Sequence, residues 1–116
     1  MPRTTNYRPG DVALVNFVFS EETGTKRRPV VVLSSDAYHR GREEAIVAAV
    51  TSNVDRVLFG DTVVDAWREA GLLYPSVATA IVRTVKQEML GKKLGTLAEG
   101  DRRRVARNLR AALGLD

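Results

Sequence analysis

The sequence contains no cysteine and only one histidine, His39. Without cysteine, disulfide bonds, thiolate metal sites and thiol catalysis are excluded. A lone histidine excludes multi-histidine metal centres and most histidine-based catalytic triads. No apolar run approaches the ~20 residues that span a bilayer, and the opening MPRTTNYRPG lacks the apolar core of a signal peptide. We therefore expect a cytoplasmic protein that holds no metal.

Composition and charge are those of a folded protein with a basic surface. Of the 116 residues, 44% are hydrophobic and 28% charged, so we expect one folded domain spanning residues 1–116. The formal net charge is +4 and most of the cations are arginine. Arginine favours forked recognition of phosphate or carboxylate. Because many basic proteins bind no nucleic acid, charge alone leaves the partner open.

Short runs rich in β-branched and aromatic residues, without helical spacing, predict strands. We expect five of them, at residues 11–19, 29–35, 45–52, 61–64 and 76–85. Polar residues at 20–28 predict a loop, and residues 36–44 and 65–72 each suggest a helical turn. The connections are too short for crossover helices, so the strands should pair antiparallel.

The last segment changes to a helical period. Apolar residues recur on one helix face at Val105, Leu109, Ala112 and Leu113. The start of this helix is ambiguous, because Thr96 with Glu99 fits a capping box and Asp101 also suits a first turn, while Gly114 fits the end. The predicted fold class is α+β, a small bent antiparallel barrel with short helices and a C-terminal helix.

The densest positive charge precedes the second predicted strand, at Lys26, Arg27 and Arg28. Pro29 restricts Arg28 to extended backbone, which makes Arg28 the best-positioned of the three to offer two parallel donors to a phosphate. Lys26 and Arg27 are candidates for neutralising neighbouring phosphates. The alternative is a solvated loop whose cations are balanced by Glu21 and Glu22.

Other polar and aromatic residues offer further candidate contacts. Thr51-Ser52-Asn53 ends an apolar strand and can hold a phosphate, although Ser and Asn are also common where a strand turns. Arg83 emerges from an apolar strand, either paired or exposed in a groove. Trp67 and Phe19 are candidates for stacking a base. His39 is interpreted as a surface residue. Leu72 and Leu73 are interpreted as core or interface residues.

Taken together, the chain resembles the MazF/PemK family of toxin endoribonucleases from bacterial toxin–antitoxin pairs. The likeness follows the order of the chain, and it rests on GDVALVNF at 10–17, KRRPVVVLS at 26–34, IVAAVTS at 46–52, GLLYPSV at 71–77, VRT at 82–84, KKLGTL at 92–97 and the terminal helix. Gly-Asp opening a strand, Arg-Pro before an apolar strand and Thr-Ser ending the next form a fairly specific set.

The resemblance implies an SH3-like barrel that forms a homodimer, cuts single-stranded RNA without a cofactor, and is blocked by an antitoxin. The family's essential arginine and threonine correspond to Arg28 and Thr51. The implied reaction is attack of the 2′-hydroxyl on phosphorus, which gives a 2′,3′-cyclic phosphate and a 5′-hydroxyl without a metal. Arg28 would stabilise the phosphorane and Thr51 would donate a hydrogen bond, with Lys26, Arg27, Ser52 and Arg83 contacting the substrate.

Two departures from the family pattern affect proton transfer. The first-loop Glu-Gln pair of many members is replaced by Thr23, and Glu22 is the nearby candidate site residue that can substitute as base; the general base stays open. An arginine–aspartate pair of some members is replaced by Ala78 and Ala80. An alternative function is that of the gyrase-inhibiting toxins, which share the fold and act by protein binding.

Overall fold

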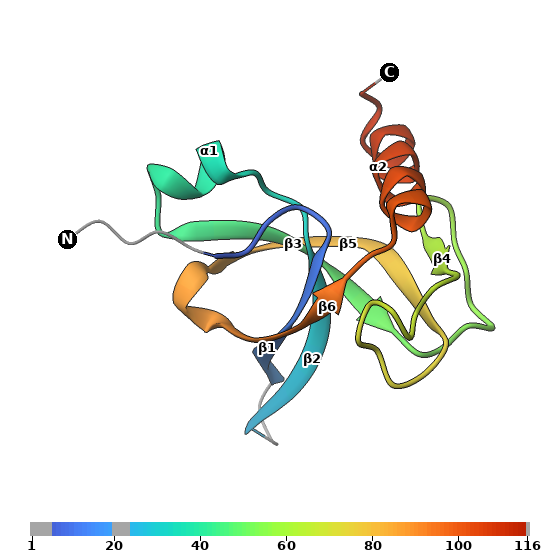
Figure 1. The fold of residues 1–116 in the computed structure, drawn as a ribbon, viewed down its shortest axis with the longest axis horizontal. Helices are drawn as coiled ribbons and strands as arrows, with labels where there is room; N and C mark the ends of the chain where they lie inside the picture. Colours follow the sequence, from blue (N-terminus) through green and yellow to red (C-terminus); the bar gives the residue numbers. More distant parts are fainter. Residues whose placement is uncertain (1–5, 20–23, 116) are drawn as a thin grey trace.

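The structure is a computed structural model that describes residues 6–19 and 24–115, with only the backbone of residues 17–19 and 24–26. Within these described residues, six strands, two α-helices and a short 3₁₀ helix follow one another (Figure 1). Their bounds are β1 Asp11–Phe19, β2 Gly24–Val32, α1 Asp36–Arg40, β3 Glu44–Thr51, β4 Thr62–Val64, β5 Ser76–Lys86, the 3₁₀ helix Gln87–Met89, β6 Leu90–Thr96 and α2 Glu99–Leu113.

The strands form one antiparallel sheet in the order β4-β5-β3-β2-β1-β6. This confirms the predicted α+β class and the antiparallel pairing. The sheet curls into a barrel-like shape, and α2 packs beside β4 and β5 (Figure 1). Neither described helix is long and apolar enough to cross a membrane.

Strand β2 begins earlier than predicted. The register of β1 with β2 runs from Val12 opposite Val31 to Phe19 opposite Gly24, so Arg27 and Arg28 lie within the strand. The prediction of a loop throughout 20–28 is therefore wrong for residues 24–28. Charged residues are uncommon in strands, so the charged first half of β2 does not have the sequence pattern of a strand. The observed strand also ends at Val32, short of the predicted residue 35.

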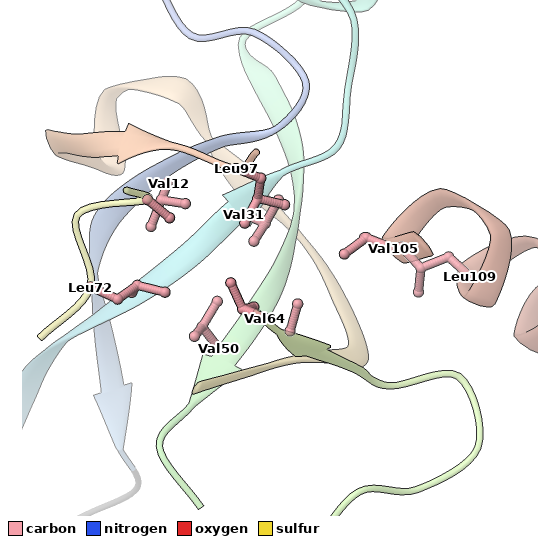
Figure 2. Packing of buried hydrophobic residues seen from close by; sticks show 10 residues of the cluster. Val12, Val31, Val50, Val64, Leu72, Leu97, Val105 and Leu109 are labelled. Atoms are coloured by element: carbon pink, nitrogen blue, oxygen red, sulfur yellow. The ribbon is translucent and has the colours of Figure 1, made fainter. Parts of the chain in front are cut away.

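The main hydrophobic core lies between the sheet and α2. Figure 2 shows Val105 and Leu109 projecting from α2 towards the valines of the strands. Both side chains are at least nine-tenths buried, which confirms the helical face predicted from their spacing. The remaining cluster members come from β1 to β5 and the segments beside them, namely Val12, Val31, Val50, Val64, Ala70, Leu72, Ala78 and Leu97.

A second cluster fills the other end of the barrel. It combines residues of β1, β2, β3, β5 and β6, namely Val15, Val30, Val32, Ala45, Val47, Val85 and Leu90, with Tyr7 packed against them. The Tyr7 hydroxyl donates a hydrogen bond to the carbonyl of Gly91. The N-terminal segment is thereby attached to β6.

Helix α2 begins at Glu99 without a side-chain cap from Ala98. The predicted capping box is wrong, because the Thr96 hydroxyl instead donates to the buried carboxylate of Asp11 at 2.9 Å. Asp101 does lie in the first turn, where it accepts hydrogen bonds from the backbone N–H groups of residues 65 and 66. Gly114 ends the helix in the left-handed conformation, as predicted.

His39 is buried rather than on the surface as expected, with 1% of the residue exposed. It lies in the last turn of the short helix α1, which is attached to the rest of the barrel by Gln87. The side-chain amide of Gln87 donates to the carbonyls of His39, Arg42 and Glu44 at 3.1, 2.9 and 2.9 Å. These bonds bring the His39 ring into the interior although its sequence neighbours are charged.

Strand β6 was not predicted, and residues 65–71 form successive turns rather than a regular helix. The register of β6 with β1 is irregular on either side of Ala13, and most of β6 is exposed or half-buried. Such irregularities remove the alternation of apolar and polar residues that signals a strand. Trp67, within the turns, packs against the main core and has the Arg68 guanidinium over its ring.

Candidate active site

A groove with a volume of about 390 Å³ opens where β2 and β3 separate. It collects four of the predicted site residues, namely Arg27, Arg28, Thr51 and Ser52. The remaining lining comes from β1, β2, β3, β6 and the segment that leads into the first residue of β5, and comprises Leu14, Pro29, Val50, Gly71, Leu72, Leu73, Tyr74, Ser76 and Leu94.

Arg28 and Thr51 belong to neighbouring strands. The pairing of β2 with β3 covers Val30 to Val32, and Val30 lies opposite Ala49. Continuing this register by two residues in each strand places Arg28 opposite Thr51. The pairing ends at Val30, directly after Pro29, which has no N–H to donate. Proline thus accounts for the end of the pairing, and the groove lies beyond it.

The Thr51 hydroxyl is already an acceptor for the chain's own backbone. Its Oγ1 accepts a hydrogen bond from the N–H of Asn53 at 3.1 Å, and Asn53 Oδ1 accepts one from the N–H of Asp55 at 3.3 Å. These two bonds match the strand-to-turn interpretation of this segment. They also orient Oγ1 and leave its proton as a donor towards the groove, so the two interpretations are compatible.

The described lining of the groove carries positive charge. Arg27 and Arg28 are both exposed, and none of the groove's described lining residues is Asp or Glu. A concave surface lined by cations attracts oppositely charged ligands. The groove is therefore suited to an anion such as a phosphodiester.

Of the other predicted site residues, Arg83 does not line this groove, while the side chains of Lys26 and Glu22 are outside the part of the chain that the structure describes. Arg83 lies in β5 opposite Val47, four residues before the end of β3. Lys26 pairs with Phe17 in the β1–β2 ladder, and its side chain lies outside the described residues, as does the whole of Glu22. The roles of these three residues stay predictions.

The two alanines that replace the family's arginine–aspartate pair are structural. Ala78 is 2% exposed and belongs to the main core, while Ala80 packs against that core. The N–H of Ala80 donates to the Asp61 carboxylate at 2.8 Å. Neither alanine lines the groove. The effect of these two replacements on proton transfer stays a prediction.

Leu73 and Tyr74 contribute an apolar surface to the groove that the sequence analysis missed. Leu73 was expected in the core or an interface, yet it is 80% exposed, and Tyr74 is 63% exposed. Leu72, beside them, is buried. The sequence signal was the pattern Gly-Leu-Leu-Tyr-Pro, in which glycine and proline indicate a turn. A turn this short cannot bury all three of the large side chains between them.

A smaller hollow of about 220 Å³ lies on the other side of Thr51. It is lined by Ala49, Thr51, Asn53, Arg56, Leu58, Asp61, Thr79 and Ile81. Leu58 and Ile81 are 55% and 59% exposed, so this hollow lies beside exposed apolar surface. Among the described residues, no group of three or more His, Asp and Glu side chains is placed to hold a metal ion.

Comparisons with known proteins agree with this architecture. Residues 8–113 match the model of the PemK-like, MazF-like toxins of type II toxin–antitoxin systems, whereas no curated protein matches the sequence significantly. The Mycobacterium tuberculosis toxin MazF-mt6 is 26% identical with a TM-score of 0.75, and the match covers 91% of this chain and 98% of that chain.

Two further solved structures share the fold at lower identity. A MazE–MazF structure from Deinococcus radiodurans has a TM-score of 0.78 at 22% identity, with 94% of this chain and 96% of that chain covered. An endoribonuclease in complex with its cognate antitoxin from a mycobacterial species has a TM-score of 0.75 at 19% identity, with the same coverage. Since the family model matches nearly the whole chain, this chain belongs to the PemK-like, MazF-like family of toxins of type II toxin–antitoxin systems.

Proposed function

We propose that this chain is an endoribonuclease toxin that cuts single-stranded RNA, including messenger RNA, in the cytoplasm. The observation that carries the proposal is the groove in which Arg28 and Thr51 lie on neighbouring strands, without a carboxylate in its described lining. Two structurally similar mycobacterial proteins are endoribonucleases, which adds support from relatives. The chain would act as a single domain over residues 1–116.

In the proposed reaction, the 2′-hydroxyl oxygen attacks the adjacent phosphorus and the bond to the 5′-oxygen breaks. The 2′-hydroxyl loses a proton, the departing 5′-oxygen gains one, and the products are a 2′,3′-cyclic phosphate and a 5′-hydroxyl. Arg28 stabilises the additional negative charge on the phosphorane, and Thr51 donates its hydroxyl proton to a phosphate oxygen. Because the guanidinium supplies the positive charge, the reaction would proceed without a metal.

We further propose that the toxin is a homodimer neutralised by a cognate antitoxin. Similar structures are described as a MazE–MazF complex and as an endoribonuclease with its cognate antitoxin. The exposed Leu58 and Ile81 beside the smaller hollow offer apolar surface of the kind that protein interfaces bury.

The test is incubation of the purified protein with single-stranded RNA in the presence of EDTA, followed by analysis of the product ends. We expect cleavage by the wild type and loss of at least about 100-fold in rate for Arg28→Ala, the size seen when one charge-stabilising donor is removed. The matched control is Arg110→Ala, an exposed arginine in α2. Intact RNA at high protein excess would refute the proposal, and gyrase inhibition without RNA cleavage would favour the alternative.

A further inference from the structure

Leu73 and Tyr74 form an exposed apolar pair, here called the apolar rim, beside the cationic part of the groove. Exposed apolar side chains that adjoin a groove are a common feature of ligand-binding and interaction sites. Leu72 already anchors this segment in the core, so the rim is not needed to attach it. Its exposure calls for a functional explanation.

The backbone holds the apolar rim in place on both sides. Before it, the N–H of Leu72 donates to the carbonyl of Trp67 at 3.0 Å. After it, the buried Ser76 donates its hydroxyl to the carbonyl of Tyr74 at 2.7 Å, and Pro75 restricts Tyr74 to extended backbone. A side chain on such a fixed segment loses little backbone entropy when a ligand binds it.

The apolar rim is also close to Thr51 along the sheet. Thr51 pairs with Val77 in the β3–β5 ladder, and Val77 follows Tyr74 by only a few residues. Thr51, Arg28 and Tyr74 all line the same groove. One nucleotide combines the two chemistries found there, since its phosphate needs cationic and hydroxyl donors and its base needs a flat apolar surface.

We propose that Tyr74 stacks the base adjacent to the phosphate held by Arg28 and Thr51, with Leu73 covering the edge of that base. This inference rests on the proposed endoribonuclease function and assigns it a nucleobase subsite. Aromatic rings stack on any base, because every base has a π face. The subsite therefore selects for an unpaired, unstacked nucleotide, which a single strand offers freely and a duplex does not, while the 2′-hydroxyl needed for cleavage restricts the reaction to RNA.

RNA, rather than a peptide, is the occupant favoured by charge. The groove offers Arg27 and Arg28 with no carboxylate in its described lining, which complements the one negative charge per nucleotide of a single strand. In this arrangement Tyr74 is a positioning residue. It holds the nucleotide so that the scissile phosphate stays against Arg28.

The test uses an uncleavable probe, a short fluorescent RNA with 2′-fluoro groups throughout, in four homopolymer versions. The tightest-binding version is then made with one abasic nucleotide at each position in turn, and affinity is measured by anisotropy. We expect one position at which removal of the base weakens binding to the wild type by about 5- to 150-fold, the range for one stacked base.

The variant series separates stacking from general apolar contact. Tyr74→Ala should lose the same 5- to 150-fold on the intact probe, and it should show no further loss on the abasic probe. Tyr74→Phe should retain the affinity, whereas Tyr74→Leu should resemble Tyr74→Ala. Phe59→Ala is the matched control, because Phe59 is an aromatic residue, 79% exposed, outside the groove lining. On cleavable RNA, Tyr74→Ala should raise KM more than it lowers kcat.

Three results would overturn the inference. The first is that the wild type binds the abasic and intact probes equally well, and the second is that Tyr74→Leu keeps full affinity for the RNA probe. The third is that Tyr74→Ala binds the RNA probe as tightly as the wild type does but binds an antitoxin peptide more weakly. The last would assign the apolar rim to the antitoxin. If RNA is cleaved in an Arg28-dependent manner while the abasic series is flat, only the subsite is refuted. If RNA stays intact, the nuclease proposal itself fails.

Discussion

The hydroxyl oxygen of Ser34 lies 2.6 Å from Nε2 of His39, and both residues are buried. Ser34 Oγ also accepts a hydrogen bond from the N–H of Ile46 at 2.9 Å, so its own proton is directed elsewhere, and Nε2 is the closest acceptor. Nδ1 of His39 has no hydrogen-bond partner among the described residues. The interior of the barrel therefore holds this imidazole in its neutral form.

The pH dependence of stability should report this burial. Burial lowers the pKa of His39 below its ordinary 6.5, and the negative charge of Asp36 offsets part of that effect. Below pH 6.5 the unfolded chain binds a proton that the folded chain refuses, so folding loses free energy as the pH falls towards the lowered pKa. Melting temperatures should therefore drop as the pH is reduced from neutral to about 5.

The matched variant for this measurement is His39→Gln, which cannot titrate in that range. It should be less stable than the wild type at neutral pH and should show a flatter profile above about pH 5. Parallel profiles for the two proteins would contradict the assignment of the slope to His39.

Gly71 should tolerate no side chain. Its φ is +81°, and a Cβ built there would lie 2.0 Å from the carbonyl oxygen of Leu94. Gly71→Ala should therefore destabilise the fold by about 3 kcal/mol or more and displace the adjacent apolar rim. Gly41→Ala is the control, because Gly41 has a φ of −100° and no atom within 4 Å of an added Cβ. Chemical denaturation of both variants measures the difference; equal stabilities would be inconsistent with this contact.

Salt should weaken RNA binding through the groove arginines. Each phosphate neutralised on a single strand contributes about 0.7 to the slope of log affinity against log salt. Arg27→Ala should reduce that slope by about this amount, whereas Arg103→Ala, an exposed arginine paired with Glu99 in α2, should leave it unchanged. Titrations of the 2′-fluoro probe over a range of salt concentrations give both slopes. An unaltered slope for Arg27→Ala would mean that Arg27 contacts no phosphate.

The proposed dimer should be sensitive to charge beside the smaller hollow. Ile81→Arg places a cation on apolar surface that the dimer would bury, so the variant should be monomeric at concentrations where the wild type is dimeric. Met89→Arg, in the 3₁₀ helix past the end of β5 and 38% exposed before substitution, is the control. Light scattering after size exclusion distinguishes the two states, and a wild-type monomer or a dimeric Ile81→Arg would contradict this interface.

Much of the fold follows from local pattern. Strands β1 and β3 and the first half of β5 contain β-branched and apolar residues whose described side chains are mostly buried, and Val105 and Leu109 already mark the buried face of α2. The register of strand pairing does not follow from local pattern, because it depends on contacts between residues that are distant in the sequence. The sequence suggested Arg28 and Thr51 separately and through a family resemblance, but only the β2–β3 pairing relates them in space.

The parts that escaped prediction share a physical cause, which is that tertiary contacts override local preference. Strand β6 pairs irregularly with β1, so its sequence shows no alternation. His39 has charged neighbours, yet bonds from Gln87, far along the chain, bring it inside. Leu72 and Leu73 were expected together in the core or an interface, yet only Leu72 is buried in the core, because the chain turns outward between Leu72 and the buried Ser76.

Pro29 has a consequence for the energetics of binding. Because β2 and β3 cease to pair at this residue, the space between Arg28 and Thr51 exists before any ligand arrives. A strand of RNA entering there would break no hydrogen bond of the described β2–β3 ladder, so no binding free energy is spent on separating the two backbones. A single imino acid thus makes the groove preorganised.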